Sequence, residues 1–109
     1  KLATYAKKIN KNEAKINWNE GAKKILAKIN GLNPNPGAWF IYKEARYKIW
    51  RAKIIEKSGP AGTIFDNNFI ICCGDKSLEI VEIQKEGKNK LLLKNFLTGI
   101  NFKRGDELK

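Results

Sequence analysis

The sequence predicts a mainly β fold, a small antiparallel barrel or sandwich with a helix before it. Three observations lead to this prediction. A segment in the first third repeats apolar residues at helical spacing. The segments after residue 37 alternate with a period of two or are short and apolar throughout. Turn residues separate them roughly every 8–12 positions, as in small all-β domains. We therefore expect one helix and five or six short strands.

The first 18 residues are polar and lysine-rich, and their apolar members Ile9, Ile16 and Trp18 do not keep one helical period. We interpret residues 1–18 as an interdomain linker that docks through these few side chains. Residues 19–109 are then a single barrel domain that begins with a helix. The chain has no methionine, even at position 1, so we expect it to be a fragment of a larger protein.

The helix is predicted between Asn19, as its N-cap, and Gly31, as a left-handed residue that ends it. One apolar stripe at positions i, i+3, i+4 and i+7 defines its buried side and consists of Ala22, Ile25, Leu26 and Ile29. Three lysines lie away from the stripe: Lys23, Lys24 and Lys28. They form either a solvated face or a ridge that faces phosphates.

The stretch NPNPGAWF at residues 33–40 joins the helix to the first strand. Pro34 and Pro36 cannot continue a helix, and each favours extended geometry in the residue before it. Gly37 permits a tight turn into a strand over residues 38–42. The stretch should therefore set the angle between helix and strand, and its aromatic residues are predicted to pack in the barrel rather than stack on bases.

A hairpin turn is predicted at residues 43–46, followed by a long strand over residues 47–55. Its period of two places Trp50, Ala52 and Ile54 on one face and Arg51 and Lys53 on the other. This strand thus presents basic side chains opposite an apolar face.

Further strands are predicted at residues 63–65, 69–73 and 77–84. In the last of these, Leu78 and Ile80 have one parity and Val81 and Ile83 the other, which a β-bulge near Ile80–Val81 would reconcile. The leucine-rich residues 91–97 predict a short helix, and no element is predicted for residues 100–109.

The charge is strongly positive and unevenly distributed. The chain carries 22 Lys and Arg against 11 Asp and Glu, a net charge of +11. Residues 1–60 hold 14 basic and 4 acidic residues, whereas residues 61–109 hold 8 and 7. Biased codon usage would also enrich lysine, but would spread it evenly. The asymmetry favours a basic patch for a polyanionic partner.

Catalytic motifs are absent from the sequence. There is no histidine, no glycine-rich phosphate loop and no serine elbow. The two cysteines, Cys72 and Cys73, are adjacent and follow an apolar run, which predicts buried thiols rather than a disulfide or a zinc site. We expect no catalytic residue and no metal site in the chain, a reducing cytoplasmic setting, and no membrane association.

Seven segments follow one another in an order that resembles the C-terminal domain of methionyl-tRNA formyltransferase. They are EAKINW at 13–18, INGLNPNPGAWF at 29–40, YKIWRA at 47–52, GPAGTI at 59–64, ICCGDKSLEI at 71–80, IQKEGK at 83–88 and FLTG at 96–99. Each segment is weak alone, but the ordered set is specific and spans nearly the whole chain.

The resemblance implies a small OB-like antiparallel β-barrel preceded by an extended linker and one amphipathic helix. It implies a parent enzyme that transfers a formyl group from 10-formyltetrahydrofolate to the methionine on initiator tRNA. Catalysis and folate binding belong to a separate N-terminal domain in that family, so this fragment is expected to be non-catalytic and to hold no cofactor. Its expected partners are initiator tRNA and the N-terminal formyltransferase domain of its own chain, and it is expected to be a monomer.

The candidate tRNA-binding residues are all basic. Lys43 and Arg46 come from the predicted hairpin turn, and three more come from the strand after it, Lys48, Arg51 and Lys53. The resemblance adds Lys88 and Lys90, in a loop that matches a basic position of the family. The linker supplies Lys7, Lys8 and Lys11.

Two other functions are compatible with the sequence. The chain could be the structural C-terminal domain of another 10-formyltetrahydrofolate-dependent formyltransferase that binds no RNA, although its charge argues against this. It could also be an unrelated basic OB-like protein that binds single strands through exposed aromatic residues.

Overall fold

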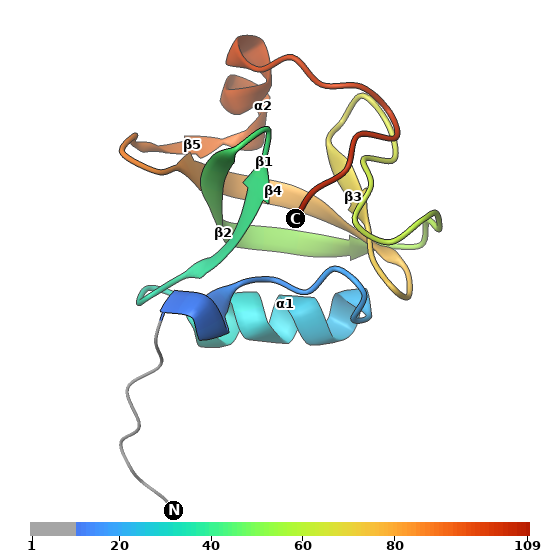
Figure 1. Cartoon of the computed structure of the whole chain (residues 1–109), viewed down its shortest axis with the longest axis horizontal. Helices are drawn as coiled ribbons and strands as arrows, with labels where there is room; N and C mark the ends of the chain where they lie inside the picture. The colour runs from blue at the N-terminus through green and yellow to red at the C-terminus, as the bar shows by residue number, and fades with distance from the viewer. Residues whose placement is uncertain (1–10) are drawn as a thin grey trace, which may run out of the picture.

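The computed structural model describes residues 11–109 and contains a curled antiparallel sheet with short helices (Figure 1). Its elements, in chain order, are η1 (Lys11–Ala14), α1 (Ala22–Gly31), β1 (Ala38–Tyr42), β2 (Ala45–Ile55), β3 (Ile70–Cys72), β4 (Ser77–Lys85), β5 (Lys90–Leu92), α2 (Leu93–Phe96) and η2 (Leu97–Gly99). The predicted mainly β class, with a helix ahead of a small antiparallel barrel, is confirmed. The division of the chain at residue 18 stays a prediction, although Ile16 and Trp18 both lie in the core.

The strands form one sheet in the order β1-β2-β4-β3, and β5 pairs with β4 beside β3. β1 and β2 form the predicted hairpin, whose turn consists of Lys43 and Glu44, both with positive φ. Such turns match the right-handed twist of the strands that they join. All the strand pairs are antiparallel.

The register between β2 and β4 shifts twice, at Ile49/Arg51 and at Arg51/Ala52. The second shift leaves Val81 unpaired, which confirms the predicted bulge in β4. Because of it, Leu78, Ile80 and Ile83 all face the core. The first shift inserts an extra residue in β2, which the sequence did not predict.

The C-terminal tail closes the sheet into a barrel. The backbone amide of Ile64 donates to Asp106 O at 2.9 Å, and that of Leu108 donates to Gly62 O at 2.7 Å. On the tail's other side, Ile41 and Lys109 exchange two backbone hydrogen bonds of 2.7 and 2.8 Å. In Figure 1 the tail accordingly descends between β1 and β3. Residues 106–109 therefore act as a final strand, for which the sequence offered no prediction.

Helix α1 lies under the barrel in Figure 1 and buries Ala22, Ile25 and Ile29. The predicted cap and end residues are wrong. The N-cap is Gly21 rather than Asn19, and the Ala22 amide donates to Asp75 O at 2.9 Å. Gly74 makes this approach possible, because a Cβ there would overlap the Asn19 carbonyl. Tertiary contact thus replaces a local side-chain cap.

The C-terminal end of α1 also differs from the prediction. Gly31 is the last helical residue and does not have a positive φ, and Leu32 forms the C-cap. The helix ends because Pro34 and Pro36 follow. Gly37 has φ of +87°, and a Cβ on it would approach the Trp50 ring at 2.9 Å, so glycine is required there. The proline stretch thus connects α1 to β1 as predicted, and its control of the helix–strand angle stays a prediction.

Residues 91–97 were predicted to be helical, but only their second half is. Lys90–Leu92 form β5, and the helix begins at Leu93. Pairing of Leu91 with Ile83 in β4 overrides the helical propensity of the leucine run.

The core contains a cluster of aromatic rings that includes Phe96 of α2. Phe69 contacts Tyr42, Phe96 and Phe102 edge to face, and Phe96 contacts Tyr47 in the same way. Cys72 and Cys73 are buried free thiols, as predicted. No helix within residues 11–109 is long and apolar enough to cross a membrane.

Candidate functional site

The outer face of the sheet is formed by the side chains of β1, β2, β4 and β5 that point away from the core. Trp50 belongs to this face, although the alternation predicted it beside Ala52 and Ile54. It is only 5% exposed, yet it lies outside the core cluster, and its indole reaches Gln84 on the outer side of β4. The extra residue at the first register shift explains the difference, because it reverses the parity of Trp50.

Trp50 is hydrogen-bonded to β4 and to the proline stretch. Its Nε1 donates to Gln84 Oε1 at 2.9 Å, and Gln84 Nε2 donates to the carbonyl of Lys88 at 2.8 Å. Asn33 Nδ2, from the proline stretch, donates to the carbonyl of Trp50 at 3.1 Å. The indole therefore has a fixed place between the proline stretch, β4 and the β4–β5 turn.

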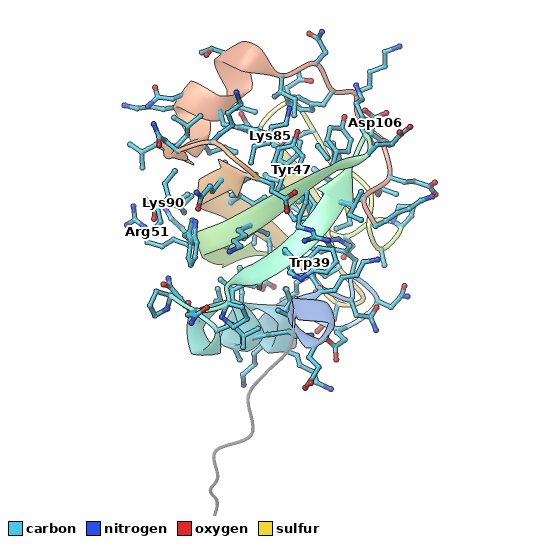
Figure 2. The ribbon with its side chains drawn as sticks, turned by 60° about the vertical axis from the view of Figure 1, so that its left-hand side comes forward. Trp39, Tyr47, Arg51, Lys85, Lys90 and Asp106 are labelled. Carbon is cyan, nitrogen blue, oxygen red and sulfur yellow. The ribbon has the colours of Figure 1, made fainter. Side chains whose placement is uncertain are left out.

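Two lysine ammonium groups lie over the Trp50 ring. Lys48 Nζ is 5.6 Å and Lys90 Nζ is 4.3 Å from the ring centroid. At such distances the ring quadrupole attracts a cation. We call Lys48, Trp50, Gln84, Lys88 and Lys90 the Trp50 corner. Figure 2 shows Lys90 projecting beside Arg51 from the same side of the sheet.

A second tryptophan carries basic groups on the same face. The Arg46 guanidinium lies 4.2 Å from the centroid of Trp39, and Lys15 Nζ lies 5.7 Å from it. Unlike Trp50, Trp39 belongs to the buried core cluster, but it pairs with Lys48 in the β1–β2 register and so lies on the same side of the sheet. Lys15 was not among the predicted site residues. It can be recognised only when the linker is seen to pair with β1.

Two of the other predicted cations of β2 form ion pairs, and the third only lies opposite an acid in the strand register. Arg46 pairs with Glu86 at 3.3 Å and Arg51 with Glu82 at 3.4 Å. Lys53 lies opposite Glu79 in the register. None of the ion pairs among the described residues involves Lys48, Lys88 or Lys90. Most other described lysines also lack an ion pair, so what distinguishes Lys48 and Lys90 is that both ammonium groups lie over one indole ring.

A hollow of about 350 Å³ lies beside the Trp50 corner, lined by Arg46, Lys48, Gln84, Glu86 and Gly87. A second, larger groove of about 610 Å³ lies between the hairpin turn and α2 and brings Lys43 and Lys88 together with Lys85. Of the predicted basic residues, Arg46 and Lys48 line the first hollow, and Lys43 and Lys88 line the second.

Lys43 has a structural role. Its Nζ donates to the carbonyl of Asn101 at 2.7 Å and lies 5.4 Å from the Tyr42 ring centroid. Tyr42 donates its hydroxyl to Asp106 Oδ2 at 2.6 Å. That hydrogen bond, with one from the Lys103 amide and the charge of Lys43, lowers the pKa of Asp106. Burial is the main cause that raises the pKa of Tyr42, and the hydrogen bond to Asp106 raises it further. In Figure 2, Asp106 lies on the opposite side of the view from Lys90.

The predicted linker residues cannot be placed. Lys7 and Lys8 lie outside the described residues, as does the side chain of Lys11.

The buried thiols and the acidic side chains of the described residues are the other candidates for reactive or metal-binding groups. Burial, with the adjacent Cys72, raises the pKa of the Cys73 thiol to about 12, so it is not a thiolate near neutral pH. Within residues 11–109, no three cysteine, aspartate or glutamate side chains gather as metal ligands.

The fold and the outer face together define a small closed barrel with a basic patch on one side of its sheet. Residues 8–101 match the family described as "Formyl transferase, C-terminal domain". The chain belongs to this family.

Curated relatives cover nearly all of the chain. Methionyl-tRNA formyltransferase of Pelagibacter ubique is 46% identical over 97% of the chain, and that of Bradyrhizobium diazoefficiens is 41% identical over 94%. The chain spans about a third of the length of these relatives, 34% in both cases.

The fold also occurs in HypX from Aquifex aeolicus. A crystal structure of HypX in complex with tetrahydrofolic acid has a TM-score of 0.74 and 17% identity, covering the whole chain and 22% of HypX. At this identity the likeness concerns the fold alone.

Proposed function

We propose that this chain is the tRNA-binding C-terminal domain of a methionyl-tRNA formyltransferase. It holds initiator tRNA on the outer face while an N-terminal catalytic domain of the same chain transfers the formyl group from 10-formyltetrahydrofolate. The parent enzyme is proposed to act in the cytoplasm, with this domain as a monomer. The 40–46% identity to enzymes of that name supports the parent activity.

The observation that carries the tRNA-binding role is the pair of lysine ammonium groups, those of Lys48 and Lys90, that lie over the Trp50 ring on the outer face. Lys48, Lys88 and Lys90 have no acidic partner among the described residues, in a chain of net charge +11. Such excess charge weakens a small fold by self-repulsion, and a polyanion would relieve it. Arg46, Arg51 and Lys53 extend the proposed surface along β2, and the linker residues Lys7, Lys8 and Lys11 continue it. Lys43, also predicted for this surface, already donates to the carbonyl of Asn101 and is proposed only as a peripheral contact.

The proposed mechanism is electrostatic rather than sequence-reading. Double-helical RNA presents phosphates and 2′-hydroxyls, which lysine and arginine can contact without reading bases. The ion pairs of Arg46 and Arg51 are exposed and therefore weak, so phosphates can displace Glu86 and Glu82. Trp39 and Trp50 are 4% and 5% exposed, and hence unsuited to stacking on bases. This disfavours a single-strand binder.

A salt titration tests the proposal. If roughly five to eight phosphates are neutralised, the logarithm of the affinity for bulk tRNA should fall steeply and linearly with the logarithm of salt concentration. Fluorescence anisotropy of end-labelled tRNA at several salt concentrations measures this slope. A flat response would contradict the proposal.

The second candidate is a structural domain of another 10-formyltetrahydrofolate-dependent formyltransferase that binds no RNA. This second candidate is supported by the occurrence of the same fold in HypX, because the fold alone does not specify an RNA ligand. A gel shift with bulk tRNA separates the two, since only the first candidate should retard it.

A further inference from the structure

One indole ring on the outer face carries two ammonium groups from different strands. Lys48 comes from β2 and Lys90 from β5, and their Nζ atoms lie 5.6 and 4.3 Å from the Trp50 ring centroid. Both strands are separated from each other by β4 in the sheet. Trp50 is therefore the shared contact that relates these two charges across three strands.

The indole itself has little freedom to move. It is 95% buried, and its Nε1 is bonded to Gln84, which also holds the β4–β5 turn through the carbonyl of Lys88. Gly37 approaches the ring so closely that even a methyl group there would lie 2.9 Å from it. The position of the ring is thus determined by the proline stretch, β4 and the turn before β5.

A fixed ring limits where the two ammonium groups can go. A free lysine side chain loses rotamer freedom when it becomes ordered on binding, which weakens the binding. A lysine already placed against an aromatic face loses less. The electrostatic surroundings also favour an anion, since neither lysine is ion-paired among the described residues and a hollow of about 350 Å³ lies beside Lys48.

We propose that Lys48 and Lys90 together hold one phosphate group of the RNA backbone, and that Trp50 and Gln84 are positioning residues of this phosphate site. The inference rests on the proposed function and deepens it. Trp50 does not stack on a base, because two lysines and its burial shield the ring. It acts through the lysines that lie over it.

The test uses the 109-residue chain, end-labelled bulk tRNA and fluorescence anisotropy at several salt concentrations. The variants are Lys90→Met, Trp50→Leu, the two combined, and Trp50→Phe, with Lys94→Met on α2 as a matched control that removes an exposed lysine elsewhere. Thermal unfolding of each variant confirms that it is folded under the binding conditions.

Lys90→Met should weaken tRNA binding about threefold to tenfold and make the salt slope shallower by about one phosphate contact. Trp50→Leu removes no charge, yet it should produce a similar loss and a similarly shallower slope. The tRNA affinity of the combined variant should fall by less than the product of the two single fold-losses, because both changes disable the same site. Trp50→Phe keeps a ring and should recover most of the affinity, whereas Lys94→Met should change it less than about twofold.

A purely structural role for Trp50 would lower the melting temperature but leave the salt slope unchanged, and that result would overturn the inference. Fully multiplicative losses in the combined variant would also overturn it. If Trp50→Leu does not fold, Gln84→Leu takes its place, because it releases the indole without emptying the corner. Gln84→Leu should weaken tRNA binding. Lys90→Met should then reduce the affinity by a smaller factor in the Gln84→Leu background than in the wild type. A multiplicative loss there would equally overturn the inference.

The result for the unmodified chain separates this inference from the proposed function. If the unmodified chain does not bind tRNA, the proposed function is wrong and the phosphate site falls with it. If it binds with a steep salt slope, but Trp50→Leu and Lys90→Met behave like Lys94→Met, only the phosphate site is wrong.

Discussion

Lysines at the β1–β2 turn and on the outer face of the sheet have different surroundings. At the hairpin turn, Lys43 donates to the carbonyl of Asn101 and lies near Asp106, so its charge is used within the protein. On the outer face, Lys48 and Lys90 lie over Trp50 and have no acidic partner among the described residues. The first region holds the tail in place, whereas the second leaves its charge available.

This difference shows that the neighbours of a lysine decide its role. Lys43 and Lys48 are five positions apart and were equivalent candidates in the sequence. Their difference comes from residues far along the chain, Asn101 and Asp106 for one and Lys90 and Gln84 for the other. We therefore expect changes near the tail to affect stability, and changes at the Trp50 corner to affect RNA binding.

The largest effect should follow from deletion of residues 106–109. The deletion removes four backbone hydrogen bonds to Gly62, Ile64 and Ile41, as well as the buried Leu108 side chain. We expect the free energy of unfolding to fall by about 4 kcal/mol, a large part of the stability of a small domain. Urea unfolding followed by circular dichroism measures it.

Leu108→Ala is the graded control for this deletion. This substitution keeps the backbone of the tail and should lower the free energy of unfolding by about 2–3 kcal/mol. The tRNA affinity of both variants, measured where they are folded, should remain within about threefold of the wild type, because the Trp50 corner is intact. A deletion that leaves the stability unchanged would show that the tail does not close the barrel.

A smaller, pH-dependent effect should follow from Asp106→Asn. The pKa of Asp106 is lowered in the fold, first by the Tyr42 hydroxyl, so its charge stabilises the fold above the ordinary carboxyl pKa of about 4. That contribution is lost as the pH falls through the lowered value. The variant should therefore be less stable than the wild type at pH 7, and the difference should shrink progressively below about pH 4.

Urea unfolding of both proteins between pH 7 and pH 2 checks this, with Tyr42→Phe as the matched variant that removes the donor. A stability difference that stays constant with pH would contradict the assigned role of Asp106. RNA affinity at pH 7 should not respond to either substitution.

Local signals in the sequence were sufficient for the hairpin and for much of the sheet. The strand over residues 38–42, the turn at Lys43 and the bulge at Val81 followed from alternation and turn residues. The cap of α1 could not be predicted in this way, because Gly21 relies on the carbonyl of Asp75, far along the chain. The tail strand pairs with Gly62, Ile64 and Ile41, and no local pattern indicates those partners.

The basic composition of the site could also be predicted, but its centre could not. The extra residue in β2 moves Trp50 to the outer face, whereas plain alternation places it in the core. The two parities in β4 were a signal of irregular pairing, but they did not reveal that β2 is irregular as well. Lys48 and Arg51 differ in that only Arg51 forms an ion pair. Its partner, Glu82, comes from the neighbouring strand β4, which the sequence near Arg51 does not reveal.

The most direct test compares two double variants that lower the net charge of +11 by the same amount. Lys48→Glu with Lys90→Glu alters the Trp50 corner, and Lys94→Glu with Lys103→Glu alters α2 and the tail. Affinity for bulk tRNA should fall at least about tenfold more in the first than in the second, because only the first repels phosphates at the proposed site. Equal losses in the two variants would mean that net charge alone attracts the RNA, and would contradict a binding surface on the outer face.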